Sequence, residues 1–394
     1  MPHLAYISFD TVPAPKGAAT HIAAFSRALA GAFGSVDLVT VCGAAASEPH
    51  AERWPGVFHT ELPGLGINLI DRVLCFRGCL ERWLSGRGFE LVQFRSIFEG
   101  IPLLRLRPRP RLIFEVNGLP SIELKHRYPR VADDRELMRK LIAQEQACLD
   151  AADRIVTPSE VTARYLTASR FVEAAKIRVI PNGVDTDLFH ASDAATEFGP
   201  EIPLLYFGTL AQWQGVDLAV RAVAQICAQA PARLTILGAG SGRQREAIRA
   251  LAGKLGIGAR VEIAPPVGQP ELVQALHRSF AVLAPLAMND RNTQQGCCPL
   301  KILEGMAAGV PVIASDLPVV RELGEHGRHF LLVKPGSVDQ IAQAVLQLRG
   351  DPVLWHQVSV GAREHILRHY TWERSGAALA AVCEELGMSL ASRA

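Results

Sequence analysis

The sequence predicts an α/β protein made of two doubly wound, Rossmann-like domains that face each other across a cleft. Its 394 residues are enough for two domains of ordinary size. Short apolar runs alternate with helix-length segments along the whole chain, which is the pattern of parallel strands covered by helices on both faces. A stretch without periodicity, residues 191–203, divides this pattern into two halves and is expected to be an interdomain linker.

The first half, residues 1–190, is expected to form the N-terminal domain. Its strands are predicted at Leu4–Phe9, Val36–Val41, Glu90–Phe94, Arg111–Val116, Arg154–Thr157 and Ile177–Ile180. Helices are predicted at His21–Ala32 and Asp133–Asp150, the second because two acidic residues at its start favour a helix N-terminus.

The second half, residues 204–370, repeats this pattern as a C-terminal domain. Its strands are predicted at Leu204–Phe207, Arg233–Leu237, Val261–Ile263, Phe280–Ala284, Val310–Ala314 and Phe330–Val333. Its helices are predicted at Val216–Gln229, Arg243–Leu255, Glu271–His277, Leu300–Ala308 and Val338–Arg349. A last helix within residues 371–388 is a candidate to pack back on the first domain. Ligands of such sheets bind at the carboxyl ends of the strands, so the cleft is the expected site.

The composition limits the possible functions. With 41 basic and 39 acidic residues, the net charge of +2 gives no bulk attraction to nucleic acid or to an anionic membrane. No signal-peptide pattern and no apolar run of about 18 residues occurs. The eight cysteines lack zinc-site spacing. We therefore expect a cytoplasmic protein with no metal and no cofactor, and with peripheral membrane contact at most.

The most specific segment runs from Pro299 through Glu304 to Gly309 and a buried strand. Pro299 suits a first helical position, and Gly309 suits a helix end. The free amides of Leu300 and Lys301 would then form an anion site, and Glu304, one turn later, could accept hydrogen bonds from ribose hydroxyls. The alternative is a plain helix–strand unit with a surface glutamate.

This segment resembles the donor-sugar signature of the retaining family-4 glycosyltransferases (glycosyl transferases group 1). Four other segments are similar to signatures of that family and occur in the same order along the chain. They are Thr157–Glu160 at the end of the first domain, Val179–Asp185 between the domains, Tyr206–Leu210 with Gly215–Asp217 as the phosphate-gripping loop, and Leu237–Gly240 after the next strand.

The resemblance implies a GT-B fold and the transfer of a sugar, with retention and without a metal, from a nucleotide-diphosphate-sugar held by the second domain. The acceptor would be a glycan or lipid-linked saccharide of the cell envelope. It also implies donor-binding residues at Gly208, Thr209, Gln214, Gly238, Gly296, Leu300, Lys301 and Glu304. The alternative is a degenerate GT-B protein that binds a nucleotide-sugar or a partner without catalysis.

Three positions depart from the family pattern and support that alternative. Gly296 stands where the family usually has a carboxylate, eight residues before Glu304. Thr209 and Gln214 stand where its gripping loop usually has an Arg and a Lys. A departing diphosphate needs its charge offset, and Lys301 is the best substitute in this segment. The alternative for Lys301 is an ordinary solvated lysine.

The first domain contributes weaker candidates. Asn117 occupies a place where many family members have a His near the transferred sugar; it can hold a hydroxyl but cannot titrate. It is included among the catalytic candidates with Lys301 and Glu304. The loop with Lys16, Gly17 and His21 resembles the family's glycine loop near phosphate and acceptor. A turn residue at Asn117 and a plain loop at 16–21 are the alternatives.

Two basic features suggest contact with the inner face of a membrane. Residues 69–84 form an amphipathic stretch with apolar Val73 and Leu80 on one side, and arginines alternate with other residues over 105–111. A core helix and a solvated edge are the favoured alternative.

Two further patterns are set aside. Asp185 and Asp187 have D-x-D spacing, but they lie in the interdomain segment. Residues 238–242 lack the third glycine of a dinucleotide fingerprint.

Overall fold

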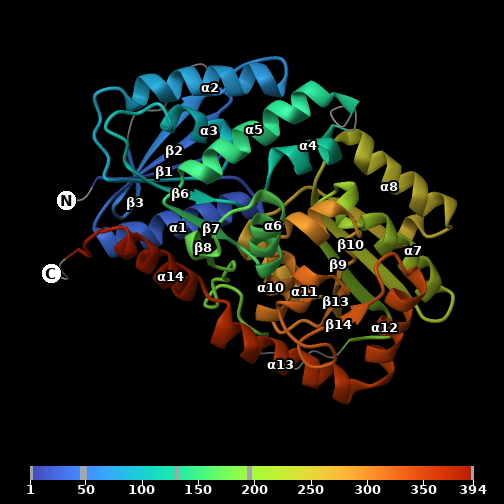
Figure 1. Cartoon of the computed structure of the whole chain (residues 1–394). Helices are drawn as coiled ribbons and strands as arrows, with labels where there is room; N and C mark the ends of the chain where they lie inside the picture. The colour runs from blue at the N-terminus through green and yellow to red at the C-terminus, as the bar shows by residue number, and fades with distance from the viewer. Residues whose placement is uncertain (1–2, 45–50, 129–132, 193–197, 392–394) are drawn as a thin grey trace.

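The computed structural model describes residues 3–44, 51–128, 133–192 and 198–391, and these form two lobes, each built on one sheet (Figure 1). The first sheet has the strand order β3-β4-β2-β1-β5-β6-β7-β8, and the second has the order β11-β10-β9-β12-β13-β14. All pairings are parallel except that of β3 with β4. The two-lobed α/β architecture that the sequence predicted is present.

In the first lobe the strands are β1 (Leu4–Ile7), β2 (Val36–Cys42), β3 (Ala51–Trp54), β4 (Val57–Pro63), β5 (Leu91–Phe94), β6 (Arg111–Glu115), β7 (Arg154–Thr157) and β8 (Ile177–Val179). Its helices are α1 (Gly17–Phe33), α2 (Leu69–Leu84), α3 (Ile97–Leu103), α4 (Pro120–Arg127), α5 (Arg135–Ala151) and α6 (Glu160–Arg170). Helix α5 begins one residue after its N-cap Asp134, whose side chain accepts from the Leu137 amide.

In the second lobe the strands are β9 (Ile202–Thr209), β10 (Ala232–Ala239), β11 (Val261–Ala264), β12 (Ala281–Ala284), β13 (Val312–Ser315) and β14 (Leu331–Val333). Its helices are α7 (Val216–Cys227), α8 (Gly242–Lys254), α9 (Gln269–His277), α10 (Leu300–Ala307), α11 (Pro318–Arg321), α12 (Val338–Gly350) and α13 (Pro352–His369). Strand β9 already begins at Ile202, inside the predicted linker, of which residues 193–197 lie outside the described part.

Strands β3 and β4 are the described strands that the sequence did not predict. Strand β4 pairs with β2 although its buried positions include His59 and Thr60, so it lacks a continuous apolar run. The His59 Nε2 atom lies 2.7 Å from the Thr40 hydroxyl, which satisfies both polar groups inside the sheet. Hydropathy alone therefore did not distinguish this strand from a loop.

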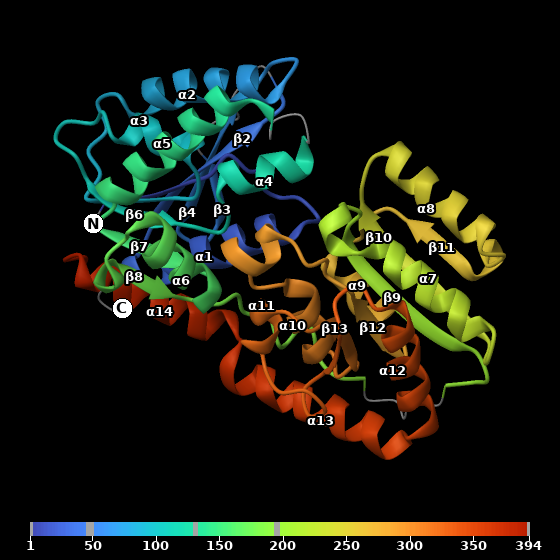
Figure 2. The same ribbon diagram turned by 45° about the vertical axis from the view of Figure 1, so that its right-hand side comes forward.

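The last helix, α14 (Trp372–Glu385), leaves the second lobe and packs against α1 of the first (Figure 2). The crossing point is tight: a Cβ on Gly183 would lie 2.3 Å from the Trp372 nitrogen. Arg154 and Arg178 both pair with Glu385 near the end of the helix. The C-terminal segment thus attaches the second lobe to the first.

In each sheet the connections leave the central strands in opposite directions. This switch falls between β1 and β5 in the first sheet and between β9 and β12 in the second. The crevice at the carboxyl ends of such strands is where doubly wound sheets bind ligands. The loop that follows β1, the end of β9 and the segment between β12 and α10 therefore carry the candidate site.

Candidate functional site

Helix α10 stands at the boundary between the lobes, and its first residue meets the loop after β1. A Cβ on Gly17 would lie 3.0 Å from the Leu300 Cδ1 atom. A side chain at position 17 would push Leu300 aside, so glycine favours this close approach of the two segments. The structure thus brings together Gly17 and Leu300, which the sequence placed on opposite sides of the cleft.

Lys301, in the first turn of α10, is buried rather than solvated. Its residue is 7% exposed, and within the described chain no hydrogen-bond partner reaches its Nζ atom. Nζ lies 4.1 Å from the centre of the Tyr206 ring, in cation–π contact. Burial lowers the pKa of Lys301 to about 7, against a weaker opposing effect of Cys297. An unpaired buried amine is costly, so the site favours an anionic ligand.

Glu304, one turn further along α10, is also buried, at 8% exposure. Burial raises the pKa of its carboxyl group to about 7. Residues three apart on a helix are neighbours, so Lys301 and Glu304 lie on the same side of α10. A cationic and an acidic group close together in one crevice could hold a phosphate and a diol.

The end of β9 forms the floor beside Lys301. Gly208 has φ +121°, and a Cβ there would lie 3.5 Å from Lys301 Nζ. Tyr206 Oη donates to the Thr209 carbonyl at 2.6 Å, so the ring under Lys301 also fixes the loop. Thr209 is exposed at this end. Gly208 and Thr209 therefore lie with Lys301, as expected for one binding site.

Gly238 and Gln214 flank this loop. A Cβ on Gly238 would lie 2.7 Å from the Gly208 carbonyl oxygen, so Gly238 permits close packing of β10 on the loop. The Gln214 Oε1 atom is buried and has no hydrogen-bond partner within the described chain. Its amide oxygen is thus a further unsatisfied polar atom beside the gripping loop.

Gly296 packs against the first lobe. Its φ is +82°, and a Cβ there would lie 2.6 Å from the hydroxyl oxygens of Ser159 and Thr162, at the start of α6 in the other lobe. The position at which the family usually has a carboxylate is therefore filled by an interdomain packing contact. A larger side chain would separate the segment from α6.

Asn117 and Lys16 lie on the first lobe's side of the crevice. Asn117 is half-buried, and its Nδ2 atom donates to Glu115, the last residue of β6. Lys16 is partly exposed and pairs with Asp10 at 3.2 Å. Asp10 in turn accepts from Arg95 Nη1 at 2.9 Å. Lys16 thus belongs to a charged network that continues into the interior.

His21 is turned into the protein and does not face the crevice. It is 4% exposed, its Nδ1 atom lies 2.7 Å from Asn182 Oδ1, and its Nε2 atom lies 2.7 Å from Glu115 Oε1. The expectation that it lines the phosphate loop therefore does not match its placement. It contacts Asn182 and Glu115 inside the first lobe instead.

The sequence reasoning missed the buried carboxylate of Glu115, which is 1% exposed. Burial alone would raise its pKa, but His21 and Arg95 hold that pKa well below the usual range. Tyr6 Oη and Gln93 Nε2 also donate to it, each at 2.6 Å. The signal available in the sequence was an acid directly at the end of an apolar strand, within the segment that contains Asn117.

Polar contacts also join the two lobes. Asp290 pairs with Lys125 and His126 of α4, and Arg291 pairs with Glu123 at 3.2 Å. On the other side of the interface, Glu322 accepts from the Val161 amide at 2.8 Å, at the start of α6. These contacts hold the lobes in the arrangement in which Gly17 meets Leu300.

The basic features do not form one membrane-facing surface. On α2, Val73 and Leu80 belong to the core, and Arg77 donates to the Ile97 and Phe98 carbonyls.

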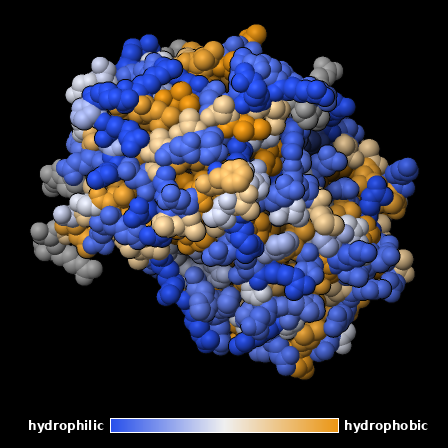
Figure 3. Space-filling view, viewed as in Figure 1, coloured by the Kyte–Doolittle hydropathy of each residue, from blue (hydrophilic) through white to orange (hydrophobic). Residues whose placement is uncertain are grey.

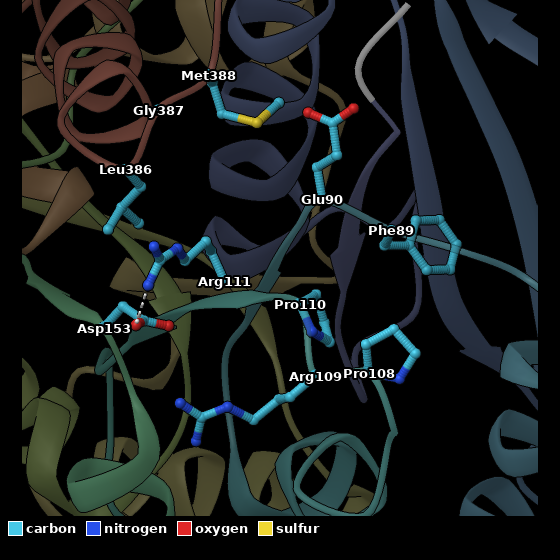
Figure 4. Close-up of a pocket in the computed structure, with 10 residues that line it drawn as sticks. All are labelled: Phe89, Glu90, Pro108, Arg109, Pro110, Arg111, Asp153, Leu386, Gly387 and Met388. Atoms are coloured by element: carbon cyan, nitrogen blue, oxygen red, sulfur yellow. Dashed lines mark hydrogen bonds and ion pairs between the residues drawn. The ribbon is translucent and has the colours of Figure 1, made fainter.

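The arginine run borders an open hollow of about 360 Å³ lined by Arg109, Arg111, Asp153 and Met388, among others (Figure 4). This hollow lies at the amino ends of β5, β6 and β7, away from the crevice. No described helix is long and apolar enough to cross a membrane.

Two family models and several known proteins match the chain. The model of Glycosyltransferase Family 4 matches residues 15–188, and that of Glycosyl transferases group 1 matches residues 201–351. The D-inositol 3-phosphate glycosyltransferase of Acidothermus cellulolyticus is 30% identical over 279 residues. That alignment spans 66% of this chain and 60% of the length of the relative.

Solved structures share the arrangement of the lobes. The sucrose-phosphate synthase of Thermosynechococcus elongatus superposes with a TM-score of 0.82 at 20% identity, covering 98% of this chain and 99% of that one. Anabaena HepE in complex with UDP-glucose gives a TM-score of 0.72 at 15% identity, covering 97% and 100% of the two chains. The fold is therefore GT-B.

Proposed function

Because the chain belongs to the family-4 glycosyltransferases (glycosyl transferases group 1), we propose that it moves a hexosyl group from a nucleotide-diphosphate-sugar to a saccharide acceptor, with retention. The observation that carries this proposal is the buried, unpaired ammonium group of Lys301 beside the end of β9. A diphosphate in this place would give Lys301 the partner that it lacks, and the first-turn amides of α10 would bind the same anion.

The proposed donor contacts follow from the geometry. Glu304 binds the ribose hydroxyls, Lys301 offsets the charge of the diphosphate, and Thr209 with Gly208 borders the phosphates. In the transfer step the bond between the anomeric carbon and the phosphate oxygen breaks, and its electron pair stays on the diphosphate. The acceptor hydroxyl oxygen bonds to the same face of that carbon, and its proton passes to the departing phosphate. No step requires a metal, because Lys301 and the helix amides supply the positive field.

Asn117 and the Gly17 loop border the sugar and the acceptor from the first lobe. Since Asn117 cannot titrate, its proposed role is to hold a hydroxyl group through its carbonyl oxygen while Glu115 accepts from its amide. The acceptor class, a glycan or a lipid-linked saccharide, rests on the family alone.

We also propose peripheral membrane contact through an apolar tip, defined as Leu65, Ile67, Ile70 and Leu74. All four side chains are exposed, and Ile67 is 98% exposed. Ile70 and Leu74 are one turn apart on α2 and stay exposed beside the core residues Val73 and Leu80. Hydrophobic residues gather at the top of the surface in Figure 3, over α2. Such a tip could enter the interface of a membrane that contains a lipid-linked acceptor.

The test of the donor site is a thermal-shift screen with UDP- and GDP-sugars, followed by turnover with a panel of saccharide acceptors. Glu304→Ala should abolish binding, whereas Glu246→Ala, on the exposed surface of α8, should leave it unchanged. If no nucleoside diphosphate binds, the proposed donor site is wrong. Binding without turnover on any acceptor would favour the non-catalytic alternative.

A further inference from the structure

A chain of polar contacts crosses from the first lobe to the start of the donor helix, behind the proposed site. Glu115 Oε1 lies 2.7 Å from His21 Nε2, and His21 Nδ1 lies 2.7 Å from Asn182 Oδ1. Asn182 Nδ2 donates to the Cys298 carbonyl at 2.7 Å. Cys298 directly precedes Pro299, the N-cap of α10.

The direction of these contacts follows from what each group can donate. The Cys298 carbonyl only accepts, so the Asn182 amide nitrogen faces it and the Asn182 oxygen faces His21. The His21 Nδ1 atom must therefore carry a hydrogen. Its Nε2 atom lies 2.7 Å from Glu115 Oε1 without the alignment of a hydrogen bond, and the same oxygen accepts from Arg95 Nε at 3.0 Å. The His21 ring therefore lies between Asn182 on one edge and the Glu115 carboxylate on the other.

The two ends of this series of polar contacts belong to the proposed site. Glu115 holds Asn117, on the side of the sugar and acceptor. Cys298 leads into the helix that carries Lys301 and Glu304. The links between them are buried, with Asn182 at 8% exposure and His21 at 4%. In such a dry chain, the loss of one member leaves its neighbours unpaired.

We propose that His21 is a positioning residue that couples the Glu115 network of the first lobe to the start of α10, so that nucleotide binding depends on the arrangement of both lobes. The nucleotide part of this statement rests on the proposed function; the structural coupling does not. If the His21 contacts strengthen nucleotide binding by a given factor, bound nucleotide must stabilise those contacts by the same factor.

The decisive variant is His21→Phe, which keeps the ring contacts with Phe25 and Trp372 and removes both ring nitrogens. The matched control is Ser26→Ala on the same helix. Ser26 is equally buried and donates to the Ile22 carbonyl, but its bond stays inside α1. Both variants lose buried hydrogen bonds, whereas only His21→Phe breaks the link to the second lobe.

The readouts are amide hydrogen exchange over residues 297–302 and the affinity for UDP and GDP. We expect His21→Phe to speed that exchange and to weaken nucleotide binding about 5- to 20-fold, while Ser26→Ala changes neither. Nucleotide should also slow exchange around residues 19–25 in the unmodified protein and not in His21→Phe.

Equal behaviour of the two variants at equal loss of thermal stability would overturn the proposal, because His21 would then be an ordinary core residue. If His21→Phe does not fold, Asn182→Ala interrupts the same series of contacts at its centre. The same two readouts, hydrogen exchange over residues 297–302 and nucleotide affinity, then decide. If neither nucleotide binds the unmodified protein, the proposed donor site fails, whereas the exchange of residues 297–302 still decides whether His21 couples the lobes.

Discussion

The ammonium nitrogen of Lys301 lies 4.1 Å from the centre of the Tyr206 ring. Tyr206 Oη donates in turn to the Thr209 carbonyl, so one ring both contacts the cation and fixes the loop beside it. Within the described chain the Nζ atom has no hydrogen-bond acceptor. The buried amine therefore lacks the anionic partner that a bound diphosphate would supply.

Replacing the buried lysine should stabilise the free protein. Lys301→Met keeps most of the side-chain volume and removes an amine whose pKa is lowered to about 7 by burial. Because the unfolded chain binds that proton more readily, the free energy of unfolding should rise by about 1–3 kcal/mol at pH 7. Urea unfolding without ligand measures this, with Lys254→Met at an exposed position as the control. A destabilised Lys301→Met would show that the amine has a partner in the free protein.

The pH dependence of UDP binding should have opposite signs in two variants. In Glu304→Gln, bound diphosphate favours protonated Lys301, so affinity should fall between pH 7 and 9, where the diphosphate is already ionised. In Lys301→Met, Glu304 with a pKa of about 7 must ionise to accept from the ribose, so affinity should rise from pH 6 to 8. Titration calorimetry measures both slopes. The same sign in both variants would contradict the assigned roles.

A methyl group at Gly208 should impair binding more than folding. The φ of +121° is strained for any L side chain, and the new Cβ would lie 3.4 Å from Lys301 Cε. We expect Gly208→Ala to lose about 1–3 kcal/mol of unfolding free energy and most of its UDP affinity. Gly256→Ala is the control for strain alone, since Gly256 has φ +72° in open space. If both variants bind UDP normally, the end of β9 does not line the donor site.

The apolar tip should govern membrane binding without affecting nucleotide binding. The double variant Ile67→Ser with Leu74→Ser removes exposed apolar area at the start of α2, so co-sedimentation with vesicles of anionic phospholipid should decrease several-fold. Val353→Ser, at an exposed apolar residue of α13, should have no effect. Equal sedimentation of all three proteins would exclude the tip as the contact surface.

The parts of the site that are close in sequence were predictable, and the parts that depend on distant contacts were not. The spacing of Leu300, Lys301 and Glu304 on one short helix already placed them together. The pairing of His21 with Glu115 joins α1 to the end of β6, and no local pattern encodes it. Gly296 was assigned to the donor site by resemblance, but its neighbours come from α6 in the other lobe.

The same distinction holds for the fold. Apolar strands such as β9 and β12 stand out from their surroundings, whereas β4 relies on the contact between His59 and Thr40 and was missed. The sequence did not settle where α14 docks, because its contacts with Gly183, Arg154 and Arg178 join segments that are far apart along the chain.

The central claim is that Lys301 holds the diphosphate of the donor, and the most direct measurement compares UDP with uridine, and GDP with guanosine, on Lys301→Met. We predict that the variant loses about 10- to 100-fold in affinity for whichever diphosphate the unmodified protein binds, which corresponds to one charged hydrogen bond, while the affinity for the nucleoside stays the same. Equal losses for diphosphate and nucleoside, or no loss for either, would contradict the account.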